Sequence, residues 1–363
     1  MPRRIAIVSD AWHPQINGVV RTLAMVADEL RFAGHRVLVI GPDRFRTLPC
    51  PIYPEIRLAL WPRRRLAALL AAFAPDSLHI ATEGPLGLAA CAIARRAGWF
   101  FTTAYHTSFP DYLAARFALP RRLTYRWLRG FHGRGAGMMV ATQTLAAELA
   151  ERGFGNTQFW SRGVDLTLFH PRNTAPLPYP RPIFLSVGRL AVEKNLPAFL
   201  ALDVPGSKLV VGDGPARAAL MRAYPEAHFL GAIEGAALAR LYASADVFVF
   251  PSRTDTFGLV LLEALASGLP IAAFPVAAPS EVLGGACPLV GVLDRDLGYA
   301  ARAALTLDRG QCRRFAEGFS WAASARQFLA NLAPLHANPA RASRAPLPAI
   351  ASQASRPRRA LPC

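Results

Sequence analysis

Two carboxylates, Asp255 and Glu263, stand eight residues apart in the segment SRTDTFGLVLLEALASG at residues 252–268. The apolar run ADVFVFP precedes the first carboxylate and is typical of a buried parallel strand. The stretch that follows is rich in Leu, Ala and Glu, which predicts a helix over residues 258–266. Asp255 therefore lies just before the start of a helix, and Glu263 lies inside it.

The start of this predicted helix is suited to bind a phosphorylated sugar. The free N–H groups of Phe257, Gly258 and Leu259, together with the positive end of the helix dipole, suit a diphosphate. The carboxylates of Asp255 and Glu263 can accept hydrogen bonds from hydroxyl groups, one on the sugar and one on the ribose. These features predict a binding site for a sugar nucleotide. The alternative is that Asp255 only caps the helix and that Glu263 is solvated or paired.

Two further segments of the second half follow apolar strands. The segment SVGRLAVEKN, residues 186–195, places Arg189 and Lys194 in a strand-to-helix loop. The segment KLVVGDGP, residues 208–215, is a strand followed by a glycine-rich turn. This turn lacks the third glycine of a dinucleotide fingerprint because Arg217 stands in its place, so we do not expect NAD binding.

The first half opens with a strand, a helix and a second strand. The sequence predicts a strand over residues 4–10, an amphipathic helix over 18–33 and a strand over 36–40. Further along, FFTTAYHTSFPDY at residues 100–112 places His106 just past the end of a strand. Ligands of open α/β sheets bind at this carboxyl edge, where a histidine can donate a hydrogen bond to a sugar oxygen. A single histidine is otherwise more often structural.

With these segments in this order, the chain resembles the retaining family-4 glycosyltransferases of the GT-B type over about residues 4–332. The usual motif of that family is Glu-x7-Glu; here Asp255 replaces the first Glu, and Glu263 matches the second. The resemblance implies an α/β fold of two Rossmann-like domains that face a central cleft, with a C-terminal helix that crosses back to the first domain. Bacterial α-mannosyltransferases and sulfoquinovosyl or other glycolipid transferases are the relatives it suggests.

The resemblance also implies roles for the charged residues. Asp255 and His106 would lie beside the transferred sugar, and Glu263 would bind the ribose. Arg189 and Lys194 would hold the donor diphosphate. A diphosphate leaving group gains negative charge as the glycosidic bond breaks, and a fixed guanidinium and ammonium stabilise that charge without a metal ion. Solvated surface charge is the alternative for these two cations.

Three glycines complete the donor site that the resemblance implies. Gly18 would meet the donor phosphates, at a place where relatives often have two glycines, while Gly212 and Gly214 would lie close to the nucleotide base. Gly18 can equally be a plain helix N-terminal residue, and the GDGP turn can be structural. The sequence Asp-Arg-Asp at 294–296 matches a metal-binding pattern of another glycosyltransferase fold class, but it lies far in sequence from these elements. We therefore expect no metal site.

The length of 363 residues exceeds what a single core usually organises, so we expect two domains. We place an N-terminal Rossmann-like acceptor domain at residues 1–170 and a proline-rich linker at 171–182. A Rossmann-like donor-nucleotide domain then covers 183–318, and the crossover helix covers 319–335. Residues 337–363 are rich in Pro, Ala, Ser and Arg, which predicts a disordered basic tail.

The net charge of +17 suggests an anionic partner. Basic, aromatic-bearing segments at residues 61–66 and 116–134 suit contact with an anionic membrane surface, and no apolar run reaches the ~20 residues of a spanning helix. Nucleic acid is the rival partner, but no nucleic-acid-binding motif accompanies the charge. The five scattered cysteines and the lack of a signal-peptide pattern favour the cytoplasm, with peripheral contact at the inner face of the plasma membrane.

The function expected from these observations is transfer of a hexose, mannose before other hexoses, from a GDP- or UDP-linked donor to a hydroxyl of a lipid or glycan acceptor. The resemblance implies retention of the anomeric configuration and no cofactor. Three alternatives stay open. They are sulfoquinovosyl or glucosyl transfer to diacylglycerol, a GT-B epimerase, and a sugar-nucleotide-binding protein without transfer activity.

Overall fold

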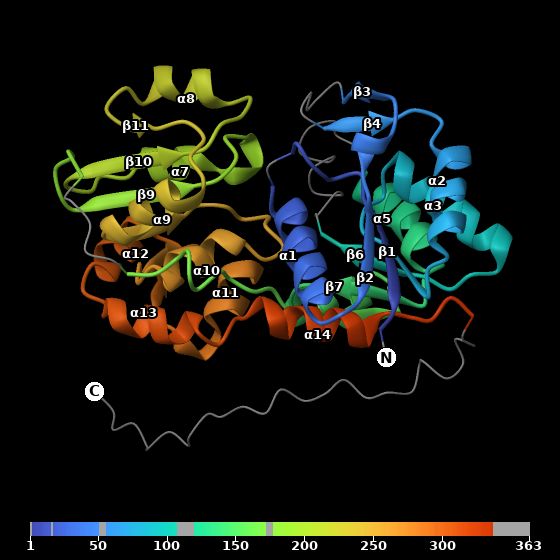
Figure 1. Cartoon of the computed structure of the whole chain (residues 1–363). Helices are drawn as coiled ribbons and strands as arrows, with labels where there is room; N and C mark the ends of the chain where they lie inside the picture. Colours follow the sequence, from blue (N-terminus) through green and yellow to red (C-terminus); the bar gives the residue numbers. More distant parts are fainter. Residues whose placement is uncertain (1, 16, 51–55, 107–119, 172–176, 337–363) are drawn as a thin grey trace.

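The computed structural model describes residues 2–15, 17–50, 56–106, 120–171 and 177–336. Two six-stranded parallel sheets lie side by side, each flanked by helices (Figure 1). This arrangement confirms the expected α/β class with two Rossmann-like units. The limits proposed above for the domains stay predictions, and residues 172–176 and 337–363 lie outside the described ranges.

The first sheet has the strand order β2-β1-β5-β6-β7-β8, with every neighbouring pair parallel. Its central strands are buried on both faces because helices cover both, which explains their continuous apolar runs. The strands are β1 (Arg4–Val8), β2 (Arg36–Ile40), β5 (Ser77–Ile80), β6 (Thr102–Tyr105), β7 (Gly137–Val140) and β8 (Thr157–Phe159), and the antiparallel pair β3 (Thr47–Pro49) and β4 (Arg57–Ala59) lies beside them. The helices are α1 (Gly18–Phe32), α2 (Arg63–Phe73), α3 (Pro85–Ala97), α5 (Arg121–His132) and α6 (Gln143–Glu151), with a 3-10 turn at Pro42–Arg44.

The second sheet has the order β11-β10-β9-β12-β13-β14 and is also parallel. Its strands are β9 (Ile183–Val187), β10 (Ser207–Val211), β11 (His228–Phe229), β12 (Val247–Phe250), β13 (Ile271–Ala273) and β14 (Gly291–Leu293). Its helices are α7 (Leu196–Leu200), α8 (Arg217–Ala223), α9 (Gly235–Ser244), α10 (Leu259–Ala266), α11 (Ala277–Leu283), α12 (Leu297–Ala304) and α13 (Arg309–Ala316), with 3-10 turns at Val192–Lys194 and Gly284–Ala286. The strand order reverses between β9 and β12, where ligands of such sheets bind.

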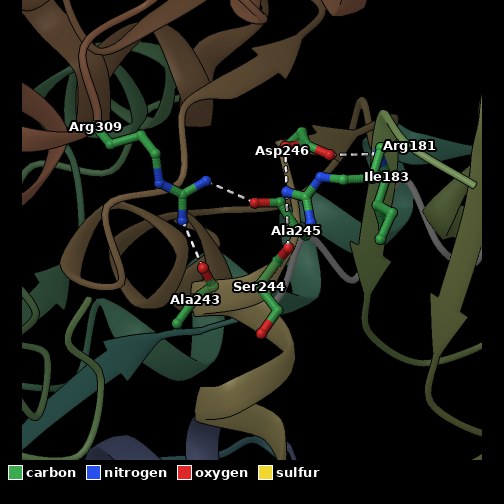
Figure 2. A network of polar contacts seen from close by, with 7 residues as sticks. All are labelled: Arg181, Ile183, Ala243, Ser244, Ala245, Asp246 and Arg309. Carbon is green, nitrogen blue, oxygen red and sulfur yellow. Dashed lines mark hydrogen bonds and ion pairs between the residues drawn. The ribbon is translucent and has the colours of Figure 1, made fainter. Parts of the chain in front are cut away.

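A polar network fixes the entry of β12, the strand that leads to the predicted carboxylates (Figure 2). Asp246 accepts hydrogen bonds from the Ile183 amide at 2.6 Å and from Arg181 at 2.5 Å. Arg309 donates to the carbonyl oxygens of Ala245 at 2.6 Å and Ala243 at 2.7 Å. The network therefore ties the end of α9 to the start of β9 and to α13.

The last helix, α14 (Trp321–Asn331), packs against α1 and under the first sheet, as Figure 1 shows. It begins at Trp321, later than in the predicted 319–335, because the Ser320 hydroxyl caps it by accepting from the Ala323 amide, and it ends at Asn331 because Leu332 takes an extended conformation. Its Phe328 is fully buried with Trp160 from the first half. The C-terminal helix thus crosses back to the first domain, as the resemblance implied.

Candidate active site

The two halves of the molecule meet at the starts of α1 and α10. A Cβ atom on Gly18 would lie 3.6 Å from the Leu259 side chain, an ordinary van der Waals separation. The Thr256 hydroxyl donates a 2.8 Å hydrogen bond to the carbonyl oxygen of His106. Predicted site residues that are far apart in sequence therefore lie together at the carboxyl edges of both sheets.

Each of these two helices begins as the sequence suggested. Asn17 caps α1 by accepting hydrogen bonds from two amides of its first turn. Gly258 precedes α10 with a φ of +80°, a left-handed conformation that favours glycine. Phe257 is buried beside it, and no side-chain hydrogen bond from Asp255 or another described residue caps α10. The first turns of both helices lack acidic residues, which leaves their positive ends available to an anion.

Asp255 pairs with Lys194 rather than capping the helix. The Lys194 ammonium lies 2.6 Å from Oδ1 of Asp255, and both side chains are partly buried. The other carboxylate oxygen, Oδ2, is buried and has no hydrogen-bond partner among the described residues. Asn195 fastens the two loops together, since its side chain donates to the Pro251 carbonyl at 3.0 Å. A buried acceptor without a partner is costly, and a sugar hydroxyl would satisfy it.

The GDGP turn supports the loop that carries Arg189. A Cβ atom on Gly212 would come within 1.9 Å of the Gly188 carbonyl oxygen, and one on Gly214 would come within 2.5 Å of the Leu190 carbonyl oxygen. The Leu190 amide also donates to the turn at 2.9 Å. Both glycines therefore have a packing reason to be glycine, and their contact with the nucleotide base stays a prediction.

His106 is held against Trp160, with their rings edge to face and their centroids 5.7 Å apart. Its Nε2 atom is buried and, within the described ranges, has no hydrogen-bond partner. Burial, and secondarily the charge of Arg162, holds the pKa of His106 well below its usual range. The neutral ring can donate or accept one hydrogen bond, which suits orientation of a sugar better than proton abstraction at neutral pH.

Arg162 is a buried cation close enough to His106 to affect its pKa, and the sequence did not single it out. Its guanidinium is 4.2 Å from the centre of the Trp160 ring, and it donates to the Trp160 carbonyl at 2.6 Å. The residue is only 4% exposed, and no carboxylate of the described chain pairs with it. Burial lowers the pKa of Arg162 to about 9. The only signal for Arg162 in the sequence was an arginine shortly after a strand. That signal fits a surface residue equally well.

Glu263 is buried and paired instead of open to the cleft. Its Oε1 accepts from Arg21 of α1, and its Oε2 accepts from the Tyr242 hydroxyl at 3.2 Å. Each oxygen keeps a further lone pair that can accept a hydrogen bond from a ribose hydroxyl. Neither partner was visible in the sequence, because both are distant along the chain.

Two acidic residues that follow strands of the first sheet, Asp10 and Glu83, are paired within the protein. Asp10 accepts hydrogen bonds from the Leu86 and Gly87 amides at 2.8 and 3.2 Å and so caps α3 from the end of β1. Glu83 lies 3.1 Å from the buried His132 ring. Both acids are satisfied within the protein, which is a structural role.

The described part of the chain contains no group of three or more His, Cys, Asp or Glu side chains that could hold a metal ion. The Asp-Arg-Asp sequence is used locally. Asp296 caps α12 through the Gly298 and Tyr299 amides, and Asp294 accepts from the amide of Asp296.

Comparisons with known proteins agree with this geometry. Residues 16–168 match the model for Glycosyltransferase Family 4, and residues 181–307 match the model for Glycosyl transferases group 1. A GDP-mannose-dependent alpha-mannosyltransferase of Mycobacterium tuberculosis is 36% identical over 308 residues, which cover 77% of this chain and 81% of that protein. The sulfoquinovosyl transferase SQD2 of Arabidopsis thaliana is 30% identical, over 75% of this chain and 59% of that protein.

Solved structures show the same fold. Sucrose-phosphate synthase from Thermosynechococcus elongatus matches with a TM-score of 0.71 and 21% identity, over 90% of this chain and 98% of that chain. Anabaena HepE in complex with UDP-glucose matches with a TM-score of 0.68 and 14% identity, over 90% of this chain and 98% of that one. The chain therefore belongs to glycosyltransferase family 4 and is a hexosyltransferase with the GT-B fold.

Proposed function

We propose that the enzyme transfers mannose from GDP-mannose to a hydroxyl group of a lipid or glycan acceptor, with retention of the anomeric configuration. One observation carries the proposal. Two buried polar atoms, Oδ2 of Asp255 and Nε2 of His106, have no hydrogen-bond partner among the described residues and belong to loops joined by the Thr256 hydrogen bond. They offer an acceptor and a neutral ring nitrogen to sugar hydroxyls. The similarity to GDP-mannose-dependent enzymes supports the choice of donor.

The proposed reaction uses no protein nucleophile and no cofactor. The bond between the anomeric carbon and the diphosphate oxygen breaks, and the acceptor oxygen forms its new bond on the same face. The acceptor proton passes to the departing phosphate oxygen. Arg189, Lys194 and the amides at the start of α10 stabilise the charge that the leaving diphosphate gains. Asp255 holds Lys194 in place and binds a sugar hydroxyl.

A second candidate is sulfoquinovosyl or glucosyl transfer to diacylglycerol. The similarity to a plant sulfoquinovosyl transferase and to an alpha-monoglucosyldiacylglycerol synthase of Streptococcus pneumoniae, 26% identical, supports it. Arg162 is the specific observation in favour of the sulfoquinovosyl donor, since glucose carries no anionic group. A buried guanidinium that acts on His106, with no carboxylate partner in the part of the chain that the structure describes, suits an anionic group on the sugar.

A ligand screen tests the donor. We expect GDP to raise the Tm of the purified protein more than UDP or ADP, because GDP is part of the proposed donor. A ligand that binds only the folded state stabilises it by about 2.7 kcal/mol at a concentration of a hundred times its Kd. The Arg189→Ala variant should lose this shift. GDP-mannose should be turned over with a hydroxyl acceptor, whereas hydrolysis or transfer of UDP-linked sulfoquinovose or glucose would favour the second candidate. Absence of any shift or product would contradict a donor site.

The acceptor proposal includes contact with an anionic membrane. None of the described helices combines the length and apolar character needed to cross a bilayer. Helix α5 has Arg122, Arg126 and Trp127 on its surface, with Trp127 44% exposed. A hollow of about 380 Å³ beside it is lined by Arg121, Arg122, Tyr125, Arg129 and Arg152. Exposed arginines with an aromatic ring suit an anionic interface.

Sedimentation with vesicles tests this surface. We expect binding to phosphatidylglycerol-containing vesicles to fall at least about thirtyfold in Arg122→Glu/Arg126→Glu, since each of the two basic residues near an anionic surface contributes about 1 kcal/mol. The matched control Arg222→Glu/Arg240→Glu makes the same charge change on exposed positions of the second half. Equal losses in the two double variants would show that net charge, rather than α5, is responsible.

A further inference from the structure

An ion pair joins the two halves of the molecule directly behind the donor site. Arg21, on α1 of the first half, binds the carboxylate of Glu263, on α10 of the second half. The Glu263 side chain is 5% exposed and that of Arg21 is 39% exposed. The Arg21 guanidinium also lies 5.3 Å from the centre of the Phe169 ring, which supports it from the side.

The pair continues the contact made at the helix starts. Gly18 lies against Leu259, and Arg21, one turn further along α1, meets Glu263, one turn further along α10. The two helices therefore stay in contact over one turn from the point where the diphosphate is proposed to bind. A shift of one half relative to the other would separate both contacts at once.

The Glu263 carboxylate needs its partners. The charged and titratable groups that face it are Arg21 and Tyr242. Burial raises the pKa of Glu263, and both the Arg21 charge and the Tyr242 hydrogen bond oppose that rise. Tyr242 is itself fully buried and un-ionised at neutral pH, because burial and the Glu263 charge raise its pKa. Arg21 is thus the only cation that stabilises this buried carboxylate among the described residues.

We propose that Arg21 is a positioning residue of the donor site, which holds the Glu263 carboxylate in place for the ribose hydroxyls so that the nucleotide binds fully only when the two halves are in contact. The inference rests on the proposed function as a sugar-nucleotide-dependent transferase, in which Glu263 takes the ribose role that the resemblance implies. It adds a residue from the opposite half to nucleotide recognition. Arg21 does not itself touch the substrate.

Calorimetric binding of GDP and 2′-deoxy-GDP to the full chain tests the proposal, with UDP and 2′-deoxy-UDP if UDP is the base that binds. We expect Arg21→Met to weaken binding of the ribonucleotide about tenfold at pH 6.5 and to bring its Kd close to that of the deoxynucleotide. The affinity of Arg21→Met for the ribonucleotide should recover as pH rises, since the Glu263 carboxylate without its cation ionises only at higher pH. The wild-type affinity should change little over the same range, and Arg21→Lys should restore part of the loss.

The matched control is Arg31→Met, which removes an exposed arginine from the same helix, and the Tm of every variant shows whether it folds. The proposal would be overturned if Arg21→Met kept the wild-type preference for the ribonucleotide and the wild-type pH dependence. It would also be overturned if Arg21→Met lost nucleotide affinity independently of pH and this loss added fully to the loss in Glu263→Gln. If Glu263→Gln binds like wild type, the ribose role itself is wrong. If Glu263→Gln is weakened and Arg21→Met is not, only the role of Arg21 is wrong.

Discussion

Replacing Lys194 with methionine is expected to lower the turnover of sugar transfer by about 10²–10³-fold, with a smaller change in donor KM. The ammonium is expected to act mainly in the transition state, where the leaving diphosphate gains charge. Asp255→Asn should cause a loss of similar size, because it removes the partner that fixes Lys194 at 2.6 Å and a hydrogen-bond acceptor for the sugar. Steady-state kinetics with the donor identified by the ligand screen measures both.

The double variant separates a shared role from two independent ones. Since the two side chains form one ion pair, Lys194→Met/Asp255→Asn should be far less impaired than the product of the single losses. Lys208→Met is the matched control, since the Lys208 ammonium donates to the Leu200 carbonyl and takes no part in the proposed site. Losses that multiply, or a Lys208 variant as impaired as Lys194→Met, would argue against the leaving-group assignment.

Gly212→Ala is expected to destabilise the second half by at least about 2 kcal/mol. The residue has a φ of +136°, and an added Cβ would meet the Gly188 carbonyl oxygen at 1.9 Å. The loop that carries Arg189 would have to move, so turnover should fall together with stability. Urea unfolding monitored by circular dichroism gives the first quantity, and donor kinetics gives the second.

Gly285→Ala is the control for this change, because an added Cβ there meets nothing within 4 Å. It should leave both the unfolding midpoint and the kinetics close to wild type. A Gly212→Ala protein of normal stability with only a raised donor KM would mean that the glycine serves the nucleotide base and not the packing of the turn.

Much of the fold follows from local patterns in the chain. Apolar runs predicted the strands β1 (Arg4–Val8) and β12 (Val247–Phe250), because a strand covered on both faces must be apolar throughout. The predicted first strand ran two residues too far. Asp10 leaves the strand to cap α3, a long-range contact that no local pattern reveals.

The sequence by itself determined which side chains gather at the sheet edges, since Lys194, Asp255 and His106 each follow a strand and the carboxyl ends of parallel strands share an edge. Only the tertiary structure decided how those groups are paired and which are left without partners. The sequence around Glu263 does not distinguish a solvated side chain from a buried one. Its partner Arg21 lies in the other half of the molecule. Burial and charge pairing depend on distances between segments that are remote along the chain, and these distances exist only once both sheets have formed and the two halves have met.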